Sequence, residues 1–212
     1  MVGRSAVAIK KRQAGRIWPL DRDLVLVSTS PYRRALLERL GVPFRCRAPL
    51  VDEEALKTGT FGPRELAERL ALAKATSLAD EEPRATLIGS DQLVAFEGRI
   101  LGKPGSPERA VEQLAAMAGK AHELITALVV WHRGQVYAHT DITILRMRPL
   151  TRAEISRYVA ADRPWDCAGS YKLEARGIAL FERIDSADHS AITGLPLIAL
   201  TTILRGLGYA IP

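Results

Sequence analysis

Cysteine is scarce in this chain, which has only Cys46 and Cys167 in 212 residues and no CxxC spacing. Two separate thiols do not make a disulfide framework, so the sequence favours a reducing compartment. Long apolar runs are also missing, and none approaches the roughly 18 residues of a membrane span. The start of the chain is basic and lacks the apolar core of a secretory signal. We therefore expect no membrane partner.

Several familiar catalytic signatures are absent as well. The chain has no GxxxxGK[ST] phosphate loop, no GxGxxG fingerprint, no HExxH pair and no GxSxG elbow. Its four histidines (His122, His132, His139 and His189) show no ligand spacing. These absences argue against P-loop NTPases, dinucleotide-binding enzymes, zinc proteases and α/β-hydrolases.

Positive charge is concentrated at the start of the chain. Residues 1–23 hold a net charge of +4, out of +6 for the whole sequence. We expect residues 1–22 to be a disordered basic tail and residues 23–212 to form a single domain. Such a tail can contact nucleic acid non-specifically, but it resembles no organised binding module, so no specific nucleic-acid partner is predicted.

The remaining sequence alternates between strand and helix patterns, which indicates an α/β architecture. Strands are predicted at 24–27, 86–96, 123–131, 136–147 and 178–184, and a short return strand follows a hairpin turn at 97–99. Helices are predicted at 31–40, 63–79, 107–119, 151–159 and 195–207. Residues 51–54 and 167–170 are predicted to be loops.

The most informative stretch is 24–37, which reads LVLVSTSPYRRALL. Its apolar run at 24–27 predicts a buried strand. Ser30 suits a helix N-cap, and Pro31 suits the first position of the helix that follows. The sequence therefore predicts a sharp strand-to-helix corner.

Two arginines occupy the first turn of that helix. The helix dipole disfavours a positive charge there by about 0.3–1 kcal/mol, and a bound anion would reverse the sign for Arg33 and Arg34. Together with the hydroxyls of Ser28 and Ser30 and the free backbone N–H groups, they predict a phosphate site. The alternative is a surface ion pair between Arg34 and Glu38.

Four further charged residues are candidates for chemistry, each with a plain structural alternative. Asp91 lies in an apolar strand, where a carboxylate is costly unless paired or metal-bound; otherwise it forms a turn at the strand end. Glu53 belongs to an acidic loop, which by itself is typical of a solvated surface. Lys74 lies near an apolar helical face, where a long stem often covers apolar surface. Lys103 lies between glycine and proline, and its alternative is a solvated loop lysine.

Taken together, one anion site, two carboxylates and two lysines suit the attack of water on a polyphosphate. Carboxylates can hold a divalent cation or deprotonate water, while lysines and arginines neutralise the charge that develops on phosphoryl oxygens.

The order of these motifs resembles the Maf family of nucleoside triphosphate pyrophosphatases, once known as septum-formation inhibitors. The resemblance spans about residues 24–208 and rests on Ser28-x-Ser30-Pro31-x-Arg33-Arg34, Asp52-Glu53, Leu70-Ala71-x-x-Lys74-Ala75, Gly89-Ser90-Asp91-Gln92, Gly102-Lys103-Pro104 and Gly194-Leu195-Pro196.

Within that family the chain looks most similar to the 7-methyl-GTP pyrophosphatase branch, through Tyr32, Gln92 and Glu174. A guanine edge offers N1–H and an amine as donors, and a carboxylate such as Glu174 only accepts. Methylation at N7 makes the base cationic, which suits a carboxylate and an aromatic face. The alternative for Glu174 is a surface pair with Lys172 or Arg176.

Two segments depart from that branch. Residues 190–193 read SAIT where relatives more often have Asn-Thr-Leu-Val, and His122-Glu123 looks more like the pyrimidine branch. These departures concern the choice of base and leave the chemistry unchanged.

The resemblance implies a Maf/ITPase-like α/β fold: a long, mixed, twisted sheet flanked by helices, with two lobes and a central cleft. It implies a cytoplasmic homodimer and a divalent metal cofactor (Mg, Mn or Co) for hydrolysis between the α and β phosphates. Asp91 would act as the general base and, with Glu53, hold the metal. The triphosphate would bind to Ser28, Arg33, Arg34, Lys74 and Lys103, and the base to Tyr32, Gln92 and Glu174.

Two other functions stay open. One is the same reaction on dTTP, UTP or CTP. The other is a non-catalytic regulator that binds division proteins or nucleic acid through the basic tail.

Overall fold

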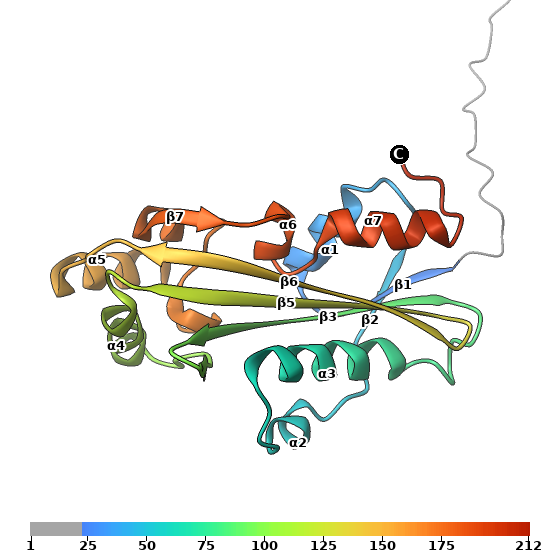
Figure 1. The fold of residues 1–212 in the computed structure, drawn as a ribbon, viewed down its shortest axis with the longest axis horizontal. Helices are drawn as coiled ribbons and strands as arrows, with labels where there is room; N and C mark the ends of the chain where they lie inside the picture. Colours follow the sequence, from blue (N-terminus) through green and yellow to red (C-terminus); the bar gives the residue numbers. More distant parts are fainter. Residues whose placement is uncertain (1–22) are drawn as a thin grey trace, which may run out of the picture.

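The computed structural model describes residues 23–212, so the predicted basic tail at 1–22 lies outside the described residues. Within them, one mixed sheet has the strand order β2-β1-β3-β5-β6-β7, with β4 paired to β3 (Figure 1). The strands are β1 (Leu24–Val27), β2 (Arg45–Arg47), β3 (Thr86–Phe96), β4 (Arg99–Leu101), β5 (Ala121–His132), β6 (Gln135–Met147) and β7 (Phe181–Asp185).

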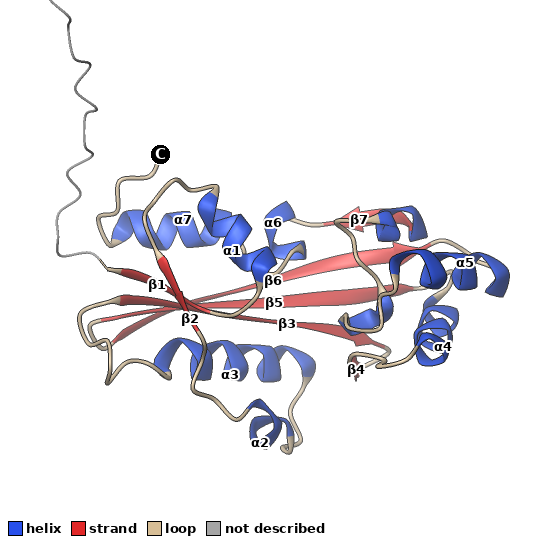
Figure 2. Cartoon of the chain, turned by 180° about the vertical axis from the view of Figure 1, so that it is seen from behind, coloured by secondary structure: helices blue, strands red, loops and turns tan. Residues whose placement is uncertain are grey.

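Helices cover both faces and one end of this sheet. They are α1 (Pro31–Glu38), α2 (Glu53–Lys57), α3 (Pro63–Thr76), α4 (Pro107–Met117), α5 (Arg152–Asp162), α6 (His189–Ile192) and α7 (Leu197–Gly206), with 3₁₀ turns η1 (Ala168–Ser170) and η2 (Arg176–Leu180). Figure 2 shows α3 on one face, α1 and α7 on the other, and α4 and α5 at the far end. In the described part of the chain, no helix combines the length and apolar character that crossing a bilayer requires.

Two hydrophobic clusters divide the molecule into lobes that share its long strands. One cluster packs α1 and α7 on β1 and β3 and includes Leu37 and Leu200. The other packs α4 and α5 against the far ends of β5 and β6 and includes Leu114 and Ile155. Strands β3, β5 and β6 pair antiparallel, while β1 pairs parallel with both β2 and β3. The predicted fold class, a long mixed sheet flanked by helices with two lobes, is confirmed.

Helix α3 packs unusually close to strand β3 at Gly89. A Cβ added there would lie 2.5 Å from the carbonyl oxygen of Ala71 and 2.5 Å from the backbone nitrogen of Ala75. Glycine on the strand and alanines on the helix therefore let the two backbones approach. This contact brings the buried side chain of Lys74 toward the middle of β3.

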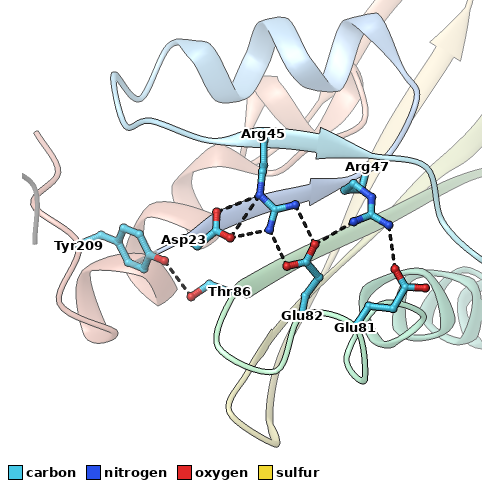
Figure 3. A network of polar contacts seen from close by, with 7 residues as sticks. All are labelled: Asp23, Arg45, Arg47, Glu81, Glu82, Thr86 and Tyr209. Atoms are coloured by element: carbon cyan, nitrogen blue, oxygen red, sulfur yellow. Dashed lines mark hydrogen bonds and ion pairs between the residues drawn. The ribbon is translucent and has the colours of Figure 1, made fainter. Parts of the chain in front are cut away.

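Charged side chains tie the short strand β2 to the connection between α3 and β3 (Figure 3). Arg45 pairs with Glu82 at 2.7 Å and with Asp23, the first described residue. Arg47 pairs with Glu82 at 2.8 Å and with Glu81 at 2.9 Å. The shared carboxylate of Glu82 makes this a network rather than separate surface pairs, which favours a measurable contribution to stability.

Local structure differs from the sequence predictions in a few short segments. Residues 51–54 were predicted to be a loop, but Asp52 caps α2, which begins at Glu53. Helix α3 ends at Thr76, and the strand predicted from 178 begins only at Phe181, after η2. Neither β2 nor α6 is predicted, because three polar edge residues and a single helical turn carry no periodic apolar pattern.

Candidate active site

The strand-to-helix corner forms as its sequence predicts. Ser30 caps α1 and its hydroxyl accepts from the backbone N–H of Arg33 at 3.4 Å. The buried hydroxyl of Ser28 accepts from the N–H of Ser30 at 3.1 Å. Pro31 occupies the first helical turn, so the chain reverses tightly and presents the first turn of α1 to the interior of the site.

Arg33 points inward from this turn and is half-buried. Its Nε donates to the carbonyl oxygen of Gly194 at 2.9 Å, which leaves both terminal nitrogens for a ligand. Burial lowers the pKa of Arg33, while the charges of Asp91 and Glu53 act in the opposite direction. Arg33 therefore extends from the first turn of α1 to within electrostatic reach of both carboxylates.

Three charged side chains from α2, α3 and β3 meet beside Arg33. The Lys74 ammonium lies 2.6 Å from Oδ1 of Asp91 and 2.9 Å from Oε1 of Glu53. The side chains of Lys74 and Asp91 are only 8% and 9% exposed, whereas that of Glu53 is 37% exposed. The two carboxylates predicted to share a metal do converge, and the cation they share in this structure is the lysine ammonium.

Arg33 also belongs to the lining of a pocket of about 350 Å³, which does not include Glu53, Lys74 or Asp91. Five predicted site residues line it: Tyr32, Arg33, Gln92, Lys103 and Glu174. Burial raises the pKa of the Tyr32 hydroxyl, and the neighbouring Glu174 carboxylate raises it further. The sequence therefore identified residues that lie up to 142 positions apart in the chain but share one pocket.

Gln92 lines this pocket from β3, and the nitrogen of its side-chain amide is already bonded to the protein. Its Nε2 donates to the carbonyl oxygens of Ala191 and Ile192 at 2.9 and 3.0 Å and contacts Oγ1 of Thr126 at 2.9 Å. Because the nitrogen is committed to the protein, the atom that Gln92 offers to a ligand is its carbonyl oxygen.

For Arg34 and Glu174 the sequence also allowed a surface ion pair, and the ion pairs in the structure decide between the two possibilities. Arg34 turns away from the pocket and pairs with Glu38 at 3.1 Å on the exposed face of α1. The structure therefore does not bring Arg34 to the site, and its surface alternative is the arrangement observed. The two surface partners considered for Glu174 are engaged elsewhere, Lys172 with Asp166 at 3.1 Å and Arg176 with Asp162 at 3.8 Å.

Several residues that line or support the pocket were not predicted from the sequence. Tyr171 lies in the pocket wall, and its hydroxyl contacts the buried His122 at 3.0 Å. The turn at 191–194 supplies carbonyl groups to Arg33 and Gln92. A tyrosine after the 167–170 loop or a backbone carbonyl near a GLP motif is not distinctive, so only the folded chain identifies them.

The arrangement suits the binding of an anionic chain beside buried carboxylates. Arg33 and the exposed Lys103 line the pocket, and the N-terminus of α1 adds the backbone N–H of Tyr32. The Lys74 ammonium is bound to Asp91, whose charge acts on Arg33. A carboxylate held next to bound phosphates can accept a proton from water, while the cations stabilise charge on the leaving group.

Comparisons with known proteins are consistent with this geometry. Residues 23–207 match the family described as Maf-like protein. The chain is 54% identical over 185 residues to the 7-methyl-GTP pyrophosphatase of Bdellovibrio bacteriovorus, which covers 87% of this chain and 97% of that protein. It is 47% identical over 200 residues to one from Polaromonas sp. (93% and 90% covered) and 48% identical over 190 residues to one from Xanthomonas axonopodis pv. citri (89% and 98%).

Proposed function

This chain belongs to the Maf-like protein family, and on that basis we propose that it is a nucleoside triphosphate pyrophosphatase that hydrolyses 7-methyl-GTP to 7-methyl-GMP and diphosphate. The observation that carries the proposal is the position of Arg33. Its side chain lines a pocket of about 350 Å³ and is close enough to the carboxylates of Asp91 and Glu53 to feel their charge. A triphosphate that follows Arg33 out of the pocket would bring its phosphates to those carboxylates.

In the proposed reaction, water attacks the α-phosphorus and the bond between that phosphorus and the bridging oxygen of the β-phosphate breaks. Asp91 accepts the proton from water. Its Oδ1 is bound to Lys74, and within residues 23–212 its Oδ2 has no hydrogen bond, so Oδ2 is the oxygen available for this proton. Arg33, Lys74 and Lys103 bind the phosphates, with Ser28 holding the corner from which Arg33 projects.

We further propose that the reaction uses a divalent cation, Mg²⁺, Mn²⁺ or Co²⁺, held by Asp91 and Glu53. The donor set fits, because oxygens of both carboxylates already converge on one cationic nitrogen. Among the described residues, no group of three or more His, Cys, Asp or Glu is placed to hold a metal. Mg²⁺ is commonly held by one or two carboxylates plus substrate phosphates, so a two-carboxylate site is sufficient. Such a cation would neutralise phosphate charge and lower the pKa of water.

Selection of the base is proposed to rest on Tyr32, Gln92 and Glu174. Glu174 accepts hydrogen bonds only, and the free atom of Gln92 is an acceptor too. Guanine presents two donors on one edge, whereas a pyrimidine such as uracil presents one donor between two acceptors. A pocket with two acceptors therefore favours guanine, and the positive charge of the 7-methylated base adds attraction to Glu174 and the Tyr32 ring.

The test is a panel of 7-methyl-GTP, GTP, UTP, dTTP and CTP with diphosphate release as the readout. We expect 7-methyl-GTP to have the highest kcat/KM, and Asp91→Asn to lose most turnover while still binding nucleotide. If a pyrimidine nucleotide is the best substrate, the assignment of the base fails but the reaction stands. If the wild-type protein releases no diphosphate from any of the five, the reaction itself is refuted.

Glu174→Gln examines base selection separately. The amide keeps the size of the side chain but removes the charge and one acceptor, so the preference for 7-methyl-GTP over GTP should fall. Glu182→Gln is a matched control, because Glu182 is an exposed carboxylate on β7 whose partner is Arg146 at 3.8 Å. An unchanged preference in Glu174→Gln would remove Glu174 from base recognition.

A homodimer is also proposed, with β6 as its contact. Within residues 23–212, β7 pairs with β6 only from Ile144 to Met147, so residues 135–143 form a free sheet edge. Val136 and Ile142 on this edge are 48% and 40% exposed. Free hydrophobic edges pair readily with another strand. Sedimentation should show a dimer, and Val136→Lys with Ile142→Lys should yield a monomer.

We place the enzyme in the cytoplasm, an assignment supported by the exposed free thiol of Cys46, which suits a reducing compartment.

The basic tail is proposed to be dispensable for catalysis, so deletion of residues 2–22 should leave kcat/KM unchanged. Loss of function on that deletion would instead favour a regulator that acts through the tail.

A further inference from the structure

One backbone carbonyl links the proposed phosphate-binding arginine to a buried serine. The carbonyl oxygen of Gly194 accepts from Nε of Arg33 at 2.9 Å and from Oγ of Ser90 at 2.8 Å. Ser90 lies on β3 next to Asp91 and is fully buried, with 0% of its surface exposed. The carbonyl oxygen of Ala127 on the paired strand also lies 2.8 Å from this hydroxyl, so the two carbonyls share its single proton. Because Ser90 is part of β3, its bond to Gly194 ties the turn to the sheet.

Gly194 itself is shaped for contact with the arginine. Its φ of +106° is a conformation that side chains rarely allow. A Cβ added there would lie 3.2 Å from Nε of Arg33, closer than ordinary van der Waals contact. The guanidinium therefore packs directly on the glycine, and a shift of this turn would shift Arg33 with it.

The rest of the turn is held from the same two strands. Gln92 on β3 and Thr126 on β5 both donate to the carbonyl oxygen of Ala191, at 2.9 and 3.0 Å. These bonds hold the beginning of the turn, but neither reaches Gly194. Of the side chains in the described part of the chain, Ser90 and Arg33 are the two that bond to its carbonyl.

We propose that Ser90 is a positioning residue that acts through the Gly194 carbonyl to fix the direction of the Arg33 guanidinium. With Nε held by that carbonyl, the two terminal nitrogens face outward as a fork that suits phosphate oxygens. Ser90 touches neither substrate nor the reacting atoms in this account. The inference rests on the proposed function only in taking phosphate as the anion that Arg33 binds.

Binding of inorganic triphosphate, measured by calorimetry, tests this without requiring turnover. Ser90→Ala should weaken binding by about tenfold, because Arg33 loses its fixed orientation, and Arg33→Lys should weaken it by at least as much. In the Arg33→Lys background, Ser90→Ala should have no further effect. Two effects that multiply instead would show that Ser90 does not act through Arg33, and the proposal would be overturned.

A matched control separates positioning from general loss of stability. Thr86→Val removes another buried hydroxyl from β3, four residues before Ser90. This hydroxyl accepts from Tyr209 at 2.8 Å (Figure 3) and, among the described residues, has no bond to the Gly194 turn. Thr86→Val should lower the melting temperature as Ser90→Ala does but leave triphosphate affinity unchanged. Equal losses of affinity in both variants would contradict a specific role for Ser90.

Two further variants keep the proposal testable if Ser90→Ala does not fold. Gly194→Ala leaves the serine in place but pushes on Arg33, so it should reproduce the loss of affinity. Ser90→Cys keeps the shape of the side chain, with a slightly larger atom, and a weak donor, so it should restore part of the binding. With nucleotide, kcat/KM should fall in step with triphosphate affinity. A wild-type protein that binds triphosphate but releases no diphosphate would refute the proposed function and leave this inference standing.

Discussion

Replacing Lys74 by methionine tests the electrostatic centre of the site. Methionine keeps most of the buried aliphatic stem and removes the ammonium that lies 2.6 Å from Asp91 and 2.9 Å from Glu53. The Asp91 side chain is 9% exposed and would remain as a buried carboxylate without its partner. Glu53, at 37% exposed, can be hydrated instead. The cost should therefore come almost entirely from Asp91.

Breaking a buried ion pair by removing one partner costs about 3–5 kcal/mol. Some solvent reaches the pair from the Glu53 side, so we take the lower end and expect Lys74→Met to lower the free energy of unfolding by about 3 kcal/mol. For a domain of this size that corresponds to a fall of roughly 6–12 °C in melting temperature.

Urea denaturation of four proteins measures this: wild type, Lys74→Met, Asp91→Asn and the double variant. The double variant should be more stable than Lys74→Met, because the neutral amide that replaces the Asp91 carboxylate no longer needs a cation. Mg²⁺ should also raise the melting temperature of Lys74→Met more than that of wild type, since the two carboxylates become free to hold it. A Lys74→Met protein within about 0.5 kcal/mol of wild type would refute the reasoning, because surface substitutions stay in that range.

Two more predictions concern stability. His122 is 3% exposed, and burial lowers its pKa to about 4. Between pH 6.5 and 4 the unfolded chain therefore binds a proton at this histidine more readily than the folded chain does, so acidification across that window should lower the free energy of unfolding by about 3 kcal/mol. The variant His122→Phe should largely abolish this loss. Gly89→Ala should lower the free energy of unfolding by more than about 3 kcal/mol, because the new methyl group meets the α3 backbone, whereas the same change at exposed, open Gly206, the last residue of α7, should cost little. Urea titrations across pH and at neutral pH, respectively, check the two.

Local sequence patterns anticipated the corner at Ser30 and the cap at the start of α5. Ser30 does cap α1, and the Thr151–Glu154 capping box at the start of α5 is present in full. These predictions succeed because a cap is a bond between residues about three positions apart, and such bonds are written in neighbouring residue types. The long strands β3 and β5 also follow directly from their apolar runs, whereas β6 shows alternating burial in its second half.

The positions of the charged groups could be predicted only in part. Arg33 and Arg34 are adjacent and chemically identical, yet one faces Gly194 and the other pairs with Glu38. The i,i+4 spacing offers Arg34 a surface partner in Glu38, but only the rotation of α1 on the sheet decides that Arg33 is the one facing Gly194. Similarly, the acidic segment at 52–54 is typical of a solvated loop, and only the packing of α2 brings Glu53 to Lys74.

Residue order alone thus accounts for the alternation of strands and helices, the corner at the start of α1 and the set of residue types that a phosphate chemistry needs. Packing between distant elements was required to place Lys74 between two carboxylates and to bond Arg33 to a carbonyl 161 positions away. The physical reason is the separation along the chain of the residues that interact. Helix and strand periodicities record hydrogen bonds between near neighbours, whereas these contacts depend on how closely separate elements pack, as α3 does on β3 at Gly89.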